Sequence, residues 1–448
     1  VPADSALTAS FAYGTEGLQY NLSDNGYDIV GYNGVETKVI IPSEWQGSAV
    51  TIIAQEAFKN CNELTNVNIP SSVIKIYGSA FSGCSGLTSI IIPDSVTSIG
   101  EGTFFGCRSL TEITLPFVGN SAKTKTDTYQ YPMGYIFGTR SYAGGVSIEQ
   151  YYYVDPTSSS TRSTYYIPSS LKSVTITGGN ILYGAFYGCR GLTSVTIPDS
   201  VTSIGDSAFS DCSGLTNVTI SNSVTSIGKY AFYQCTGLTS VTIPDSVTNV
   251  GPHAFRGCSG LKSVTIGNSV TSIGYYAFEN CTGLTSVTIP ADVKSIGEDA
   301  FTDCSKLVEV INNSSLNIVK GSSDYGYVGR YALKVKKGGT SEIVNKDGYL
   351  FYTYNNANYL LSYVGKDTQL TLPSDHNGQR YEIYKYAFLG CSGLTSVTIP
   401  DSVTSIGEYA FRGCTGLTNV TIPDSVTSIG SSAFYDCSGL KSVTIGNS

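Results

Sequence analysis

The stretch "CSGLTSVTIPDSVTSIGEYAF" occupies residues 391–411, and nearly the same words, "CTGLTSVTIPADVKSIGEDAF", occupy residues 281–301. Cysteine marks the repeat, with 23 residues between neighbours inside each of three runs. The cysteines are Cys61, Cys84, Cys107, then Cys189, Cys212, Cys235, Cys258, Cys281, Cys304, then Cys391, Cys414 and Cys437. A Phe stands three residues before each Cys and a Leu three residues after it. A fixed period of this length predicts a solenoid of stacked coils.

Within each coil the apolar residues alternate in two short segments separated by a turn such as "PDS". In one coil the inward residues are Leu192, Val195, Ile197, Val201, Ile204, Ala208, Phe209 and Cys212. We expect two short strands whose apolar sides face a common axis, with outward Ser and Thr between them. One coil buries too little to fold alone, so coils must stack with strands about 4.8 Å apart.

The pattern C-x-x-L-x-x-V-x-I-P-x-x-V-x-x-I-G-x-x-A-F-x-x-C resembles the BspA-like class of leucine-rich repeats, found mainly in secreted and surface-attached bacterial proteins. The match covers about residues 50–116, 168–311 and 382–448. It implies a curved right-handed repeat solenoid of mainly short β-strands with irregular or short helical convex segments. The L-x-x-V-x-I strands would then lie on the concave face. It implies no active site, and it implies adhesion or host-protein binding only for the class.

Composition limits the partners. Charged residues are 13% of 448, the net charge is −8 and the pI is about 4.9, which argues against a nucleic-acid partner. The longest apolar runs, such as "NILYGAF" at 180–186, are shorter than the roughly 20 residues of a membrane span. The chain begins without Met and stops within a repeat, so we expect processed or cut ends; a removed signal peptide is one explanation.

Two interruptions divide the repeats. The segment "GVETKVIIPSEWQGSAVTIIAQEAF" at 34–58 matches "GKDTQLTLPSDHNGQRYEIYKYAF" at 365–388 at one constant offset of its Gly and Pro residues. We therefore expect a cap at the start of the chain and a cap-like module inside it. The expected division is an N-terminal cap at 1–48, repeat blocks at 49–116, 168–311 and 382–448, a Tyr-rich insertion at 117–167, and a cap-like insertion module at 312–381.

The insertions carry the candidate binding residues. Their tyrosines either pack on the flank of the solenoid or form a binding surface, and the sequence leaves both open. The candidates are Tyr131, Tyr135, Tyr151, Tyr152, Tyr153, Tyr352 and Tyr354. We also expect that the segment 117–167 leaves from a coil corner, outside the stack, so that a short turn could replace it.

No catalytic, cofactor or metal site is predicted. The cysteines share one column, so we expect parallel, buried, free thiols. The sequence contains no CxxC motif, so it does not suggest a zinc site. The chain holds only His253, in a variable corner, and His376, in the turn "SDHNG", which leaves no Ser/His/Asp arrangement. Carboxylates such as Glu298 and Asp299 stand where the coils vary and read as surface charges. The outward Ser and Thr suit either a solvated strand or a repetitive ligand.

The predicted function is that of a non-enzymatic, secreted or cell-surface leucine-rich repeat protein that binds extracellular or host proteins. The alternative is a polysaccharide-binding or polysaccharide-cleaving protein that uses the Tyr-rich insertions, because aromatic faces stack on sugar rings. In both, the partner is an extracellular protein or a glycan.

Overall fold

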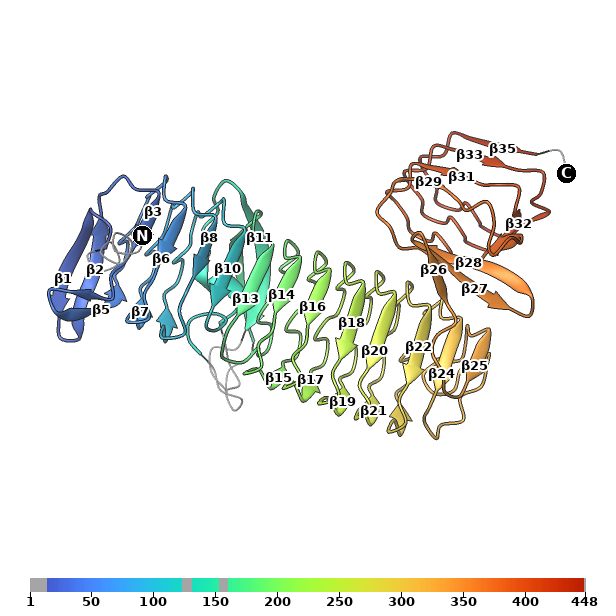
Figure 1. Ribbon diagram of the computed structural model, residues 1–448, viewed down its shortest axis with the longest axis horizontal. Coiled ribbons are helices and arrows are strands. Elements are labelled where there is room, and N and C mark those ends of the chain that lie inside the picture. The colour runs from blue at the N-terminus through green and yellow to red at the C-terminus, as the bar shows by residue number, and fades with distance from the viewer. Residues whose placement is uncertain (1–13, 123–130, 153–159, 447–448) are drawn as a thin grey trace, which may run out of the picture.

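A computed structural model describes residues 14–122, 131–152 and 160–446. The chain forms a β-solenoid in two bodies, the first over residues 14–336 and the second over residues 344–446 (Figure 1). The strands of the first body stand side by side across its long axis, whereas strands of the second body such as β33 and β35 run roughly along that axis. The repeat-solenoid fold predicted from the sequence is confirmed.

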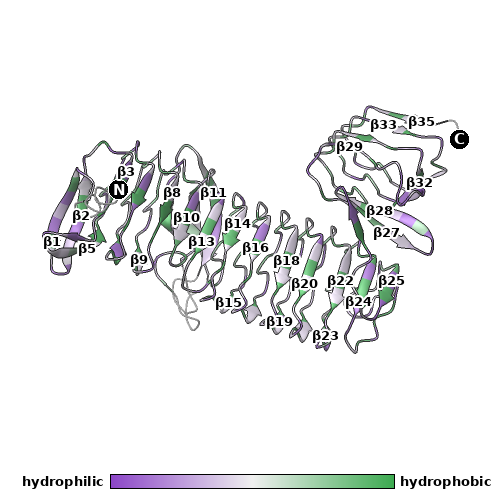
Figure 2. Ribbon diagram, viewed as in Figure 1, coloured by the Kyte–Doolittle hydropathy of each residue, from purple (hydrophilic) through white to green (hydrophobic). Residues whose placement is uncertain are grey.

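One side of the first body is a row of parallel strands built from the S-V-T-I segments, called here the V-x-I face. Its strands are β3 (Lys38–Ile40), β6 (Asn66–Asn68), β8 (Ser89–Ile91), β10 (Glu112–Leu115), β13 (Ser173–Ile176), β14 (Ser194–Thr196), β16 (Asn217–Thr219), β18 (Ser240–Ile243), β20 (Ser263–Ile266), β22 (Ser286–Ile289), β24 (Glu309–Asn312) and β25 (Lys334–Lys336). Equivalent residues pair across coils, for example Val241 with Val264. The Val and Ile side chains at the inward positions are buried, while Ser and Thr, and Ile91 of β8, point outward; Figure 2 shows residues of both hydropathies within one strand.

A second side carries two-residue strands built from the S-I segments. They are β7 (Lys75–Ile76), β9 (Ser98–Ile99), β15 (Ser203–Ile204), β17 (Ser226–Ile227), β19 (Asn249–Val250), β21 (Ser272–Ile273) and β23 (Ser295–Ile296). Each strand pairs in parallel with the residues at the equivalent positions one coil away, as Ile204 does with Ile227. A Pro-initiated turn connects the two sides, with the N–H of Val201 donating to the carbonyl of Pro198.

The third side, called here the corner, consists of turns from the G-x-x-A-F-x-x-C segments. Its coils are joined by backbone hydrogen bonds such as that from Phe232 N–H to the carbonyl of Ala254, at 2.7 Å. Among the described residues the one helix is the 3-10 turn η1 (Met133–Ile136). Of the two forms expected for this side, the irregular one is therefore the form adopted.

Stacked phenylalanines fill the core beneath the corner. The ring centroid of Phe232 lies 5.1 Å from that of Phe209 on one side and 5.1 Å from that of Phe255 on the other, and the ring planes are nearly parallel. All three side chains are fully buried. The 23-residue period thus places identical rings in register.

Each body begins with an antiparallel hairpin that continues into parallel strands. In the first body β1 (Leu18–Ser23) pairs β2 (Gly26–Tyr32), which pairs β5 (Ser48–Ile53), with β4 (Glu44–Trp45) beside β5. In the second, β26 (Val344–Lys346) and β28 (Ala357–Tyr363) flank β27 (Tyr349–Tyr354), and β28 pairs β30 (Tyr381–Ile383), followed by β32 (Val403–Ile406) and β34 (Ser428–Ile429). Its V-x-I face is β29 (Gln369–Thr371), β31 (Ser396–Thr398), β33 (Asn419–Ile422) and β35 (Ser442–Ile445). Apart from β26, which has no counterpart among the described strands of the first body, the two modules share one pairing order.

Candidate functional site

Part of the first interruption belongs to the stack. The N–H groups of Gly102 and Phe104 donate to the carbonyls of Tyr135 and Ile136, at 3.0 and 2.8 Å. On the other side, Met133 N–H donates to the carbonyl of Ala185, at 2.8 Å. The turn η1 therefore replaces a G-x-x-A-F corner between two regular coils. The expectation that all of 117–167 lies outside the stack is wrong, because η1 satisfies backbone groups of both neighbouring coils.

The rest of the interruption is a two-stranded hairpin of β11 (Gly145–Tyr152) and β12 (Thr161–Pro168). Gln150 fixes this hairpin to the solenoid, and its side chain is completely buried. Its Nε2 donates to the carbonyl of Tyr187 and its Oε1 accepts from the N–H of Gly134, both at 2.8 Å. The hairpin therefore stands in a defined position over the corner of the adjacent coil.

A cavity of about 580 Å³ lies between this hairpin and the coil, called here the hairpin cleft. Its apolar lining includes Ile148, Ile167, Leu171 and Leu192. Its polar lining includes Glu149, Tyr151, Lys172, Tyr187, Arg190 and Asp211. Apolar walls with a few charged and aromatic groups are typical of a recognition site.

The aromatic and charged side chains of the cleft support each other. Tyr151 and Tyr187 meet edge to face with centroids 5.5 Å apart. Arg162 forms an ion pair with Glu149 and lies 5.9 Å from the centre of the Tyr151 ring. Burial and the nearby carboxylate of Asp211 raise the pKa of Tyr187 to about 12, so its hydroxyl stays protonated and can donate a hydrogen bond.

Of the tyrosines predicted in the first interruption, Tyr151 lines the cleft. Tyr131, Tyr135 and Tyr152 instead pack on one another, with the ring of Tyr131 4.4 Å from Tyr135 and 5.1 Å from Tyr152. Tyr152 is buried and the other two are half-buried. Tyr153 lies outside the described residues. These three tyrosines fit the packing alternative.

The tyrosines predicted in the second interruption lie near the contact between the two bodies. Tyr352 is fully buried against Val308, and burial raises the pKa of its phenol. Tyr354 is half-buried, with Lys320 Nζ 4.9 Å from its ring centre. Of the seven candidates, the six that the structure describes do not lie together on one surface.

A second aromatic surface, which the sequence analysis passed over, lies on the corner of the regular coils. The rings of Tyr230, His253 and Tyr276 stack one coil apart, at 4.4 and 4.9 Å, and are called here the corner ladder. Arg256 lies 5.5 Å from the Tyr276 ring and pairs with Glu279 at 2.8 Å. Tyr275 beside them is 42% exposed. A second such pair, Tyr386 and Tyr409, stacks at 5.5 Å in the second body.

The backbone at the ladder is unfavourable for bulky residues. Tyr230, His253 and Tyr276 have φ values of 57°, 55° and 57°, in the left-handed region. Tyr386 and Tyr409 are left-handed at the same position of the second body, and the remaining coils place Gly, Ser, Asp or Glu there, such as Gly102 and Gly184. A left-handed aromatic residue is an uncommon and strained choice, and such strain concentrates at functional sites. In the sequence the ladder residues appear in "GKYAF", "GPHAF" and "GYYAF", at a position that varies from coil to coil. That variation was interpreted as solvent exposure, although the aromatic residues in three consecutive coils could have indicated the ladder.

The two histidines lie in different bodies of the fold. His253 stands in the ladder, and His376 stacks on Phe351 at 4.3 Å in the second body. Burial lowers the pKa of both imidazoles. Over residues 14–122, 131–152 and 160–446, no group of three His, Cys, Asp or Glu is placed to hold a metal ion. In the same part of the chain, no helix is long and apolar enough to cross a membrane.

Comparison with known proteins gives a family match and several structural likenesses. The profile described as "BspA type Leucine rich repeat region" matches residues 37–129, 179–308 and 381–448. No curated protein matches the chain.

Three solved structures illustrate the likeness. A leucine-rich repeat protein from Bacteroides ovatus has 25% identity over 96% of this chain and 93% of its own, with a TM-score of 0.38. A leucine rich cell surface protein from Faecalibacterium prausnitzii has 23% identity over 98% and 95%, with a TM-score of 0.25. The pneumococcal vaccine antigen PcpA has 21% identity over 64% and 69%, with a TM-score of 0.26. All three TM-scores lie below 0.5.

Proposed function

This chain belongs to the BspA-type leucine-rich repeat family, and from that premise we propose that it is an exported, surface-displayed adhesion protein that binds a partner protein through the hairpin cleft. The family's repeats are interaction scaffolds, and its members occur mainly among secreted and surface-attached bacterial proteins. Export, adhesion and the absence of an enzymatic role are all part of this proposal.

The hairpin cleft carries the proposal because it breaks the uniformity of the repeats. On the V-x-I face the outward residues are nearly the same from coil to coil, for example Ser240 and Thr242 followed by Ser263 and Thr265. The cleft instead combines Tyr151, Tyr187 and Arg190 over an apolar floor. Binding energy in protein interfaces concentrates in Tyr, Trp and Arg anchors that sit in such pockets.

The corner ladder extends this surface. Asp211 lines the cleft, and its N–H donates to the carbonyl of Tyr233 on the next coil, three residues after Tyr230. Cleft and ladder therefore occupy the same corner of consecutive coils. A partner that seats an aromatic or aliphatic side chain in the cleft would then lie along the ladder.

The polysaccharide alternative finds less support in the ring geometry. Rings of the ladder stack face to face, so they offer their edges outward rather than the faces on which sugars stack. In the cleft, Arg162 lies over Tyr151.

The test is a binding screen of the full chain against purified extracellular and matrix proteins, followed by affinity measurement with variants. Arg190→Ala and Tyr151→Ala are each expected to weaken a partner by about tenfold or more. Arg108→Ala is the matched control, because Arg108 is exposed and also follows the Cys of its coil. It should change affinity by less than about twofold.

Unchanged affinity in both cleft variants would overturn the assignment of the site. A parallel glycan array addresses the alternative, since sugar binding lost in Tyr151→Ala would favour a polysaccharide ligand and count against the proposal.

A further inference from the structure

The last coil of the first body that carries the repeat Cys departs from the repeat sequence where the second body docks. It reads "CSKLVEVIN" at 304–312, whereas the preceding coil reads "CTGLTSVTI" at 281–289. Lys306 thus replaces a Gly and Glu309 replaces a Ser. Both side chains are buried, with exposed fractions of 4% and 0%. The other charged residues at these two repeat positions, Glu63 and Glu112, are exposed, so the burial of Lys306 and Glu309 calls for a separate explanation.

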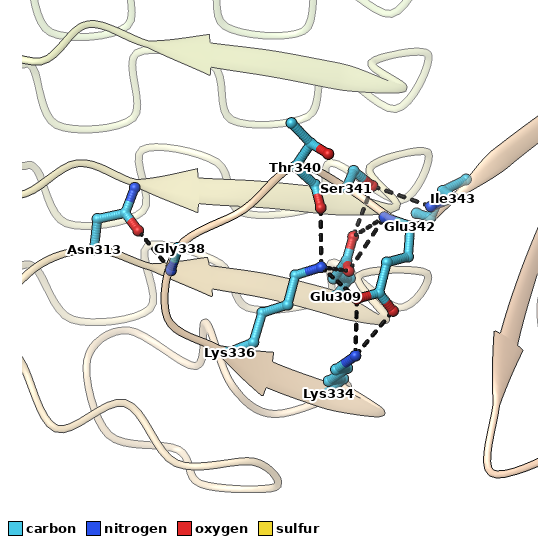
Figure 3. A network of polar contacts seen from close by, with 9 residues as sticks. All are labelled: Glu309, Asn313, Lys334, Lys336, Gly338, Thr340, Ser341, Glu342 and Ile343. Carbon is cyan, nitrogen blue, oxygen red and sulfur yellow. Dashed lines mark hydrogen bonds and ion pairs between the residues drawn. The ribbon is translucent and has the colours of Figure 1, made fainter.

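The buried carboxylate of Glu309 has a partner of opposite charge and several hydrogen-bond donors (Figure 3). Its carboxylate pairs with Lys336 Nζ at 2.9 Å and accepts hydrogen bonds from Ser341 Oγ at 2.6 Å and the N–H of Glu342 at 3.1 Å. Glu342 in turn pairs with Lys334 and Lys336. This network fixes the segment that leads from the first body to the second, so Glu309 has a structural role.

The buried ammonium of Lys306 has no comparable set of partners in the described part of the chain. Its Nζ donates to the backbone carbonyl of Ala387 in the second body, at 2.8 Å. Over the described ranges it has no carboxylate within ion-pair distance. The titratable groups acting on it are Lys262 from the first body and the thiols of Cys391 and Cys414 from the second. Within the contact between the two bodies, the ammonium of Lys306 therefore has one backbone carbonyl and a second cation, Lys262, as its polar neighbours.

The remainder of this contact is apolar. Val308 packs with Leu350, Tyr352, Leu361 and Tyr384 of the second body. We call the contact made by these residues, Lys306 and Ala387 the elbow. Apolar burial holds the elbow closed, and the charge on Lys306 opposes closure.

We propose that Lys306 makes the docking of the second body on the first depend on pH, so that the elbow is tightest in alkaline medium and loosens as pH falls toward neutrality. The geometry that carries this proposal is a buried ammonium at the contact, beside Lys262 and without an acid.

The direction follows from the two states of Lys306. Burial, and next the charge of Lys262, lower its pKa in the closed elbow to about 7. In an open elbow the exposed amine has its usual pKa of about 10.4. Between these values the open state binds more protons, so each unit of falling pH favours opening by up to about tenfold. Below pH 7 both states are protonated and the effect levels off.

Lys262 and the thiols modify this response without reversing it. Burial also lowers the pKa of Lys262, so loss of its proton at high pH further favours the closed elbow. Burial raises the pKa of Cys414 far above neutrality, and its thiol stays uncharged through the transition.

The test follows opening of the full chain by small-angle X-ray scattering at increasing low urea concentrations, between pH 6 and pH 9.5. For the natural sequence, the urea concentration that opens the elbow should fall from pH 9.5 to 7 and stay constant below. Lys306→Met, which removes the charge and keeps the volume, should raise the opening concentration at pH 7 and flatten the pH dependence.

Two further variants keep the test decisive if Lys306→Met fails to fold. Lys262→Thr restores the residue of the neighbouring coils and should reduce the pH dependence, whereas Lys441→Thr, at the same repeat position but exposed at the far end of the second body, should not. A natural sequence whose opening is independent of pH from 9.5 to 7 overturns the proposal. So does a pH dependence that Lys262→Thr leaves unaltered when Lys306→Met does not fold.

Discussion

The Sγ of Cys258 lies 3.2 Å from the backbone carbonyl oxygen of Phe232, one coil earlier, and donates a hydrogen bond to it. The same bond recurs through the stack at Cys84, Cys107, Cys212, Cys235, Cys281, Cys304, Cys414 and Cys437. Each of these thiols thus points at a backbone carbonyl of the preceding coil rather than at the neighbouring sulfur. All twelve cysteines are free.

This arrangement predicts unreactive thiols. Burial raises the pKa of Cys258 to about 12, so the thiolate that reacts with alkylating agents is scarce at pH 8. Cys61 and Cys391 are half-buried because each stands in the first regular coil of its body, and they should be modified first. Native mass spectrometry after timed alkylation would measure this order. Rapid labelling of Cys258 or Cys235 in the folded chain would contradict it.

The phenylalanine column predicts a large cost for one truncation. Phe232 is fully buried between Phe209 and Phe255, so Phe232→Ala leaves a cavity and should lower the free energy of unfolding by about 3–5 kcal/mol. Tyr233→Ala is a suitable control, because the neighbouring ring is only half-buried on the corner. Urea unfolding of both variants gives the comparison, and equal losses would argue against the column as the main source of stability.

The repeated coil could be predicted from the sequence because every coil repeats the same physical choices. Val195 and Ile197 lie inside and Ser194 and Thr196 face outward on β14, as alternation required. The prediction failed for Met133, Ile136 and Phe137, which complete a coil without its spacing or its Cys. No local pattern marks them, since only the backbone bonds to Gly102 and Ala185 reveal the corner.

Tyrosine misled the site prediction for a related reason. A tyrosine has an apolar ring and a polar tip, so its sequence neighbourhood does not distinguish Tyr151 at a cleft from Tyr352 in a core. The internal module was better marked, because the constant offset of Gly34 and Gly365 accompanies a shared pairing order. That both modules act as caps remains a prediction.

The left-handed corner predicts an unusual response to glycine. Tyr230 has φ 57°, packs edge to face on Tyr233 at 5.5 Å and stacks on His253 at 4.4 Å. Tyr230→Ala and Tyr230→Gly lose the same ring contacts, but only Tyr230→Gly also relieves backbone strain, of about 1 kcal/mol. Tyr230→Gly should therefore be less destabilising than Tyr230→Ala by about that amount in urea unfolding. The reverse order would remove the argument that the ladder is strained.

The hairpin over the cleft depends on Gln150, which leads to the last prediction. Gln150→Ala leaves the buried N–H of Gly134 and the carbonyl of Tyr187 without their partner, at a cost of about 1–3 kcal/mol. Because η1 and the coils keep their own bonds, the loss should appear first as detachment of the hairpin. Cleavage within Gly145–Tyr152 or Thr161–Pro168 by a protease should accelerate by about tenfold or more, while Ser147→Ala, on the exposed side of β11, should leave the rate unchanged. Partner binding should fall in Gln150→Ala in parallel with Tyr151→Ala. If the hairpin stays protected, the docking of β11 and β12 rests on other contacts, and Gln150 does not set the width of the cleft.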